Sequence, residues 1–168
     1  MMRWLGCLLG LSIVIAIPQR LCAADWVDEQ TVGIYLFHAE FPLRDVEDLV
    51  TELGELQKDI ESTLELKCKD RPIEIFLFRS RFSYTSYIRT NVPEGAGRQA
   101  VYVAGNDGAR VYAFRHRDLG TDLRHETTHA LLHNALPYVP LWLDEGLAEY
   151  FEEPAKLRVE GSSHRRSL

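Results

Sequence analysis

The chain has 168 residues, the usual size of one domain; hydrophobic residues make up nearly half of it and charged residues about a quarter. This composition is that of a globular protein, and it excludes disordered, collagen-like and coiled-coil chains. Acidic residues outnumber basic ones by 25 to 19, which gives a net charge of −6. An acidic chain without a basic stripe argues against nucleic-acid binding. Because it has only one long apolar run, the chain is not a multi-span membrane protein.

That apolar run lies at the amino terminus. A positive segment ends at Arg3, and an apolar stretch of 14 residues follows from Trp4 to Ile17. The run is shorter than the roughly 20 residues that span a bilayer, and it matches the central region of a secretory signal peptide. Small residues ending at Ala24 form a cleavage site. We therefore expect residues 1–24 to be a cleaved signal peptide rather than an uncleaved anchor. The mature protein would be exported, periplasmic or secreted, with no stable membrane association.

Cleavage after residue 24 removes two of the three cysteines, Cys7 and Cys22, and leaves Cys68. A single cysteine forms no internal disulfide. We expect a half-buried thiol that follows a helix.

Periodicity and turn residues predict the elements along the rest of the chain. They are a strand at 34–37 continuing to 41, an amphipathic helix at 42–67, a buried strand at 73–78, a helix at 80–89, strands at 99–104 and 110–115, a helix at 122–134 with Thr121 as N-cap, and a helix at 141–153.

Asp107-Gly108, between two β-rich runs, predicts a hairpin. The whole pattern predicts an α+β domain over residues 25–154, with a mostly antiparallel sheet of about four strands. Residues 155–168 are polar and read as a disordered tail.

The segment with the most chemical information is His125-Glu126-Thr127-Thr128-His129, an H-E-x-x-H pattern. On a helix, residues four apart lie on one face, so His125 and His129 can bind one metal ion. Glu126 would lie beside that ion and take a proton from a water molecule held there. Two imidazoles and a carboxylate suit Zn²⁺.

An acidic segment, Trp142 to Tyr150, follows at a distance that a helix–loop–helix return can bridge. Spacing alone leaves Glu145 and Glu149 both open as the carboxylate ligand, because they lie four residues apart on one face. Asp144 points about 100° away from Glu145 on a helix, which suits a capping or outer role.

From His125 to Phe151 the sequence resembles the gluzincin-type (peptidase MA-like) zinc metallopeptidases. It is most similar to an uncharacterised bacterial family with H-E-x-x-H and W-L-x-E-G-L-A-E-Y-F. The resemblance implies a zincin-like fold, one zinc ion, Glu145 as third ligand, Glu126 as general base, and a peptide or protein substrate. It also implies that strand 110–115 is the edge strand of the cleft. The small residues at 146–148 would let the two helices approach closely.

Other zinc patterns fit less well. The metzincin extension requires Gly and His where this chain has Leu132 and Ala135. His133 lies two turns, about 12 Å, from His125 along the helix, too far to share one ion, so an outer or surface role is expected.

Gluzincins continue well past the third ligand, into a segment that supplies an oxyanion-stabilising Tyr or His. Here Tyr150 and His164 are available, and neither lies in a matching motif. The rival hypothesis is a non-catalytic zinc-binding domain with a structural or binding role. A metal-free globular domain is a third.

Overall fold

The computed structural model describes residues 25–105 and 108–158; the predicted signal peptide lies outside this part of the chain. Within it, no helix is both long and apolar enough to cross a membrane. The elements, in order, are β1 (Asp28–Val32), β2 (Tyr35–Ala39), the 3-10 helix η1 (Leu43–Val46), α1 (Glu47–Thr63), β3 (Ile73–Phe78), α2 (Arg81–Asn91), the 3-10 helix η2 (Pro93–Gly95), β4 (Ala100–Ala104), β5 (Ala109–Phe114), α3 (Leu119–Ala135) and α4 (Leu141–Phe151).

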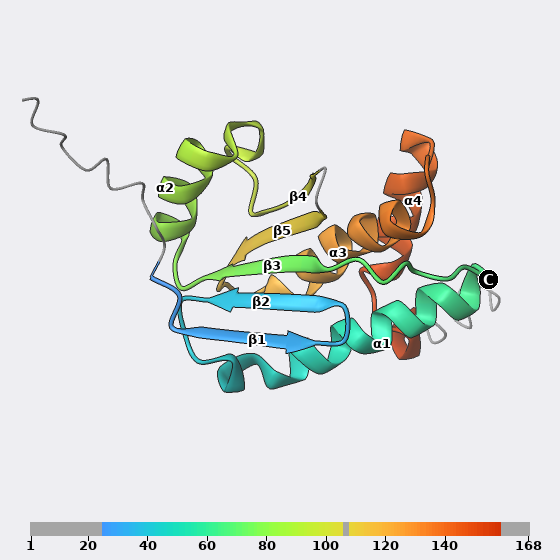
Figure 1. Ribbon diagram of the computed structural model, residues 1–168, viewed down its shortest axis with the longest axis horizontal. Coiled ribbons are helices and arrows are strands. Elements are labelled where there is room, and N and C mark those ends of the chain that lie inside the picture. Colours follow the sequence, from blue (N-terminus) through green and yellow to red (C-terminus); the bar gives the residue numbers. More distant parts are fainter. Residues whose placement is uncertain (1–24, 106–107, 159–168) are drawn as a thin grey trace, which may run out of the picture.

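The five strands form one sheet in the order β1-β2-β3-β5-β4 (Figure 1). Strands β2, β3 and β5 are parallel, and the edge strands β1 and β4 are antiparallel to their neighbours. The α+β class is confirmed. The described sheet has five strands instead of about four, however, and its two central pairings are parallel. The connection from β2 to β3 passes through α1, as a parallel pair requires.

Strand β1 is absent from the sequence prediction. Its central three side chains are exposed, so it lacks the apolar alternation that marks a half-buried strand. It joins β2 through Gly33, whose φ of 59° suits glycine. An exposed edge strand of this kind is recognised only from its pairing with β2.

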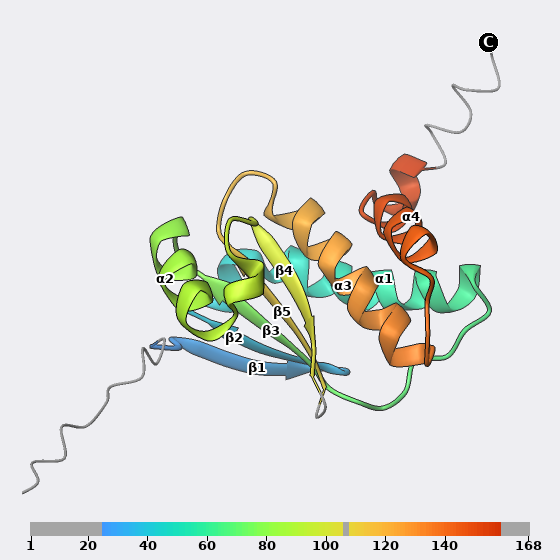
Figure 2. The same cartoon turned by 90° about the horizontal axis from the view of Figure 1, so that it is seen from above.

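Helices cover both faces of the sheet (Figure 2). Successive side chains of β3 point to opposite faces and separate two cores. Ile75 and Leu77 lie in the larger core, with α1 and α3, whereas Phe76 and Phe78 lie in the smaller core, with α2. Helix α4 packs chiefly against α3. Helix α3 therefore lies between the sheet and α4.

The largest differences from the predicted helix boundaries are in α1 and α3. Helix α1 begins at Glu47, after the 3-10 helix η1, five residues after the predicted start at 42. Helix α1 ends at Thr63, four residues before the predicted end at Lys67. Helix α3 begins three residues before the predicted start, with Asp118 at its N-cap and no side-chain cap. The amide of Asp122 already donates to the carbonyl of Asp118 at 3.1 Å, so Thr121 lies inside the helix and the N-cap prediction is wrong.

The predictions for the hairpin and for Cys68 are confirmed. Strands β4 and β5 pair antiparallel, and the Gly105 amide donates to the Gly108 carbonyl at 2.8 Å; Asp107 lies outside the described residues. Cys68 is a free, half-buried thiol that follows α1. Burial, with the charge of Glu61 and a hydrogen bond to it, raises its pKa to about 12, so the thiol is protonated at neutral pH.

The first residues of the predicted tail pack against the domain. Residues 155–158 form a helical turn. The Arg158 guanidinium lies 4.8 Å from the ring centre of Tyr150 and 4.9 Å from that of Phe151, and it pairs with Asp59 of α1. The described part of the domain therefore extends past residue 154.

Candidate metal centre

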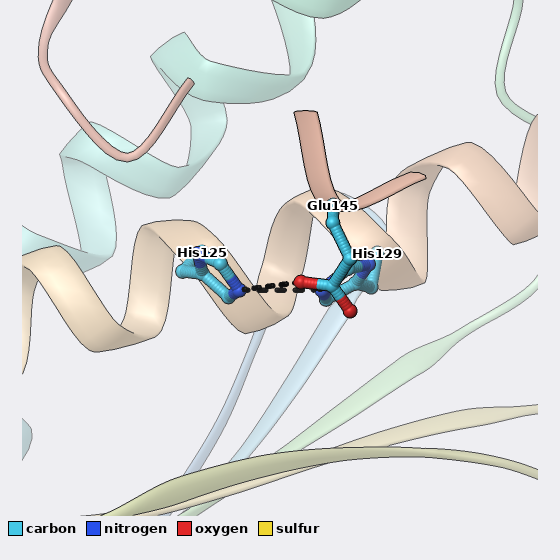
Figure 3. Close-up of side chains that lie close together, drawn as sticks. All are labelled: His125, His129 and Glu145. Carbon is cyan, nitrogen blue, oxygen red and sulfur yellow. Dashed lines mark hydrogen bonds and ion pairs between the residues drawn. The ribbon is translucent and has the colours of Figure 1, made fainter. Parts of the chain in front are cut away.

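His125, His129 and Glu145 converge where α3 meets α4 (Figure 3). The Nε2 atoms of the two histidines lie 3.3 Å apart. Oε2 of Glu145 lies 3.7 Å from Nε2 of His125 and 3.9 Å from Nε2 of His129. The structure therefore brings the three predicted ligands together.

These separations suit a small tetrahedral ion. Ligand atoms about 2.1 Å from a tetrahedral zinc ion lie about 3.4 Å from one another. The observed 3.3, 3.7 and 3.9 Å need only small shifts to match this spacing. Two imidazole nitrogens and one carboxylate oxygen are also a donor set that zinc accepts in hydrolytic sites. The residues present therefore fit a zinc ion.

The two histidines lie on α3, a helix that is packed into the larger core. Their spacing of four residues places both on one side of the helix, one turn apart. Around them, Leu123, Ala130 and Leu131 are almost completely buried in the larger core. The position of the histidine pair is therefore fixed by the packing of α3 against the rest of the domain.

Helix α4 approaches α3 through Ala148, so the prediction that small residues at 146–148 permit close approach holds at Ala148 and is wrong at Gly146. Ala148 is fully buried, whereas Gly146 is exposed, and a Cβ atom added to it would have no neighbour within 4 Å. A helical turn separates Ala148 from Asp144, so these two residues share the side of α4 that faces α3. The small side chain that permits close approach is thus Ala148, not Gly146.

Each histidine has a carboxylate at its other ring nitrogen. Nδ1 of His129 lies 2.9 Å from Oδ1 of Asp144, and Nδ1 of His125 lies 3.1 Å from Oε2 of Glu152. A carboxylate at Nδ1 favours the tautomer with its proton on that atom and leaves the lone pair of Nε2 for a metal. Each candidate ligand imidazole therefore has an acid beside Nδ1, from α4 for His129 and from its C-cap for His125, and turns Nε2 toward the candidate metal position.

Asp144 also binds His133, whose Nε2 lies 2.9 Å from Oδ2 of the carboxylate. The ring of Tyr102 stacks on both His129 and His133. Burial acts to raise the pKa of Asp144, but the hydrogen bonds and charges of His129 and His133 outweigh it and hold the pKa below its usual value. His133 thus lies outside the triangle of candidate ligands and contacts it through Asp144, a position compatible with the outer roles expected for both residues.

Glu126 lies against the edge of the sheet. Its Oε2 accepts a hydrogen bond of 2.7 Å from the backbone amide of Tyr102 in β4. The predicted edge strand, 110–115, is wrong: β5 pairs on both sides, with β3 and β4, and β4 forms the edge. Because β4 and β5 are both apolar, the sequence does not indicate which of them is the edge strand. The general-base candidate therefore faces the open edge of the sheet.

An open depression lies beside the site. Its walls come from the loop and strand at 97–100, from α3 and from the end of α4, and they include Arg98, His125, Glu126 and Glu152. His125, a candidate ligand, and Glu126, the candidate base, therefore border an open, solvent-facing surface.

Glu149 and Tyr150 lie on the outer side of α4. Glu149 is exposed, and the Tyr150 ring contacts Phe151 and Arg158. His164 lies outside the described residues. The geometry therefore places Glu145, and not Glu149, beside the two histidines.

Glu152 is the site residue that the sequence analysis missed. It lies seven residues after Glu145, a spacing that returns to nearly the same helical face after about two turns, and the sequence therefore carried a signal for it. No known family model matches the chain, and no curated protein is detectably similar to it.

Proposed function

We propose that the protein is a zinc-dependent, peptidase-like hydrolase of the gluzincin type, with His125, His129 and Glu145 as ligands of one zinc ion. The observation that carries the proposal is the triangle of donor atoms, with sides of 3.3, 3.7 and 3.9 Å. The carboxylates at both Nδ1 atoms support it, because they prepare each imidazole to bind metal through Nε2.

In this proposal Glu126 is the general base. When bound, zinc polarises a peptide carbonyl and makes water more acidic. Glu126 takes the proton of the attacking water and passes it to the amine that leaves. Its hydrogen bond from the Tyr102 amide holds the carboxylate between α3 and β4.

The substrate in this proposal is a peptide or protein in extended form. Strand β4 is an edge of the described sheet, and a peptide can add to such an edge through main-chain hydrogen bonds. The depression that borders His125 and Glu126 starts beside the beginning of β4. A bound strand would therefore pass over the candidate base.

One observation favours a non-catalytic zinc domain as second candidate. Tyr150, a candidate for stabilising the oxyanion, is half exposed and stacked against Arg158 instead of facing the ligands. An oxyanion donor is a large part of catalysis in acyl transfer. A domain with the same ligands and no such donor would bind zinc without turnover.

The variant Glu126→Gln separates the two candidates. It keeps the size of the side chain but cannot accept the proton. We expect zinc to stay bound while cleavage of a mixed peptide library falls by at least about a hundredfold. Loss of zinc in this variant would make Glu126 a ligand and refute the assignment. Absence of cleavage by the zinc-loaded wild type would favour the non-catalytic domain.

A further inference from the structure

Arg124, the residue before the first ligand histidine, is a buried cation, with only 4% of its surface exposed. Burying a charge is costly unless it is well paired. Among the described residues, no carboxylate forms an ion pair with Arg124. Its guanidinium donates instead to the main-chain carbonyls of Phe151, at 3.0 Å, Glu152, at 3.0 Å, and Glu153, at 3.3 Å.

These carbonyls lie at the C-terminal end of α4. The last carbonyls of a helix have no partner within the helix and carry the negative end of its dipole, so a cation is favourable there. Arg124 supplies that cation from another helix. It thereby fastens the end of α4 to α3.

The same attachment reaches the metal site through Glu152. Arg124 binds the main chain of Glu152, while the next residue of α3, His125, contacts its side chain at 3.1 Å. Two consecutive residues of α3 thus hold one residue of α4 at two points. The carboxylate of Glu152 has little freedom to leave Nδ1 of His125.

We propose that Arg124 and Glu152 are positioning residues for the metal site: Arg124 fixes the end of α4, and Glu152 then fixes the ring and tautomer of His125. The inference rests on the proposed zinc site. It predicts that Arg124, which touches none of the three ligands' donor atoms, controls how well His125 binds metal.

The test measures zinc affinity of the full chain by competition with a chromogenic chelator. We expect Arg124→Lys and Glu152→Ala each to weaken zinc binding by about tenfold, the usual cost of losing an outer partner of a metal ligand. Because the two act in one chain of contacts, the double variant should bind within about threefold of the weaker single variant.

Arg158→Met is the matched control. Arg158 also binds near the end of α4, stacking on Tyr150 and Phe151, but it has no contact with Glu152 or the histidines. Loss of the Arg158 side chain should lower the melting temperature and leave zinc affinity within about twofold of the wild-type value. Unchanged zinc affinity in Arg124→Lys, with a lower melting temperature, would reduce Arg124 to a structural role and overturn the inference.

A second readout does not depend on zinc. Nitrogen NMR of the metal-free protein reports which ring nitrogen of His125 carries the proton. We expect Nδ1–H in the wild type and a mixture of tautomers in Arg124→Lys. Identical tautomer populations in the two proteins would overturn the inference. A wild type that binds no zinc would refute the proposed function, and the tautomer measurement would then decide the inference alone.

Discussion

Helices α3 and α4 both contribute to the candidate site, but the domain holds them differently. Ten residues of α3 are buried, whereas α4 buries only Asp144, Ala148 and Phe151. The first turn of α4 exposes Leu141 and Trp142 by about three quarters. The histidine pair is thus positioned by the hydrophobic core, and Glu145 by a small contact and several polar bonds. Damage to α3 should therefore affect the whole fold, and damage to α4 mainly the site.

The largest effect on stability is expected in α3. Leu131 is completely buried, so Leu131→Ala should lower the free energy of unfolding by about 2–5 kcal/mol through lost burial and the cavity left behind. Leu141→Ala on α4 removes an exposed side chain and should change the free energy of unfolding by less than about 0.5 kcal/mol. Urea denaturation of both variants compares them. Equal losses would show that α4 is as deeply embedded as α3.

The next prediction concerns the third ligand. Glu145→Ala should weaken zinc binding by about a hundredfold or more, because it removes one of three protein ligands. Glu149→Ala, which changes an exposed residue one turn away, should leave affinity nearly unchanged. Chelator competition with both variants side by side gives the answer. If zinc affinity fell sharply in Glu149→Ala alone, the third ligand would be Glu149, one turn along α4, and not Glu145.

The packing of α4 against α3 is tested by introducing a larger side chain at their contact. Ala148→Leu should cost about 1–3 kcal/mol through overpacking and should weaken zinc binding, because Glu145 is pushed away from the histidines. Gly146→Ala is the control: this position is open and helical, so alanine should stabilise by up to about 1 kcal/mol. If Ala148→Leu left zinc affinity intact, the contact at Ala148 would not position Glu145.

A smaller effect is expected from Asp144. Asp144→Asn keeps the shape of the side chain but removes the charge that faces His129 and His133. Zinc affinity should fall by about tenfold. Asp59→Asn, which removes a carboxylate that pairs with Arg158 and, within the described part of the chain, forms no hydrogen bond or ion pair with the three candidate ligands, serves as the control and should keep wild-type affinity. Equal zinc affinity in Asp144→Asn and the wild type would remove Asp144 from the site.

The sequence predicted the part of the site that lies on a single helix, the histidine pair of α3. The histidines lie four residues apart on one helix, so their common face follows from helical geometry alone. The choice of Glu145 over Glu149 depends on how α4 rotates against α3. Spacing left both residues open, and the family resemblance favoured Glu145, which the structure places beside the histidines.

The features that the sequence did not predict depend on tertiary structure. Strand β1 is exposed and polar, so its sequence carries little signal for pairing with β2. Strands β4 and β5 are both apolar enough to be interior, and the order of the sheet decides which is the edge. Glu152 was missed because its contact with His125 depends on how α4 packs against α3. The signal peptide and the export of the protein remain predictions.

The proposed function requires that His125, His129 and Glu145 hold one zinc ion. Native mass spectrometry of the chain, purified without chelator and titrated with zinc, tests it most directly. We expect one zinc ion per wild-type chain, and none retained by His129→Ala under the same conditions. A wild-type chain that stays metal-free, or a His129→Ala chain that keeps its zinc, would contradict it.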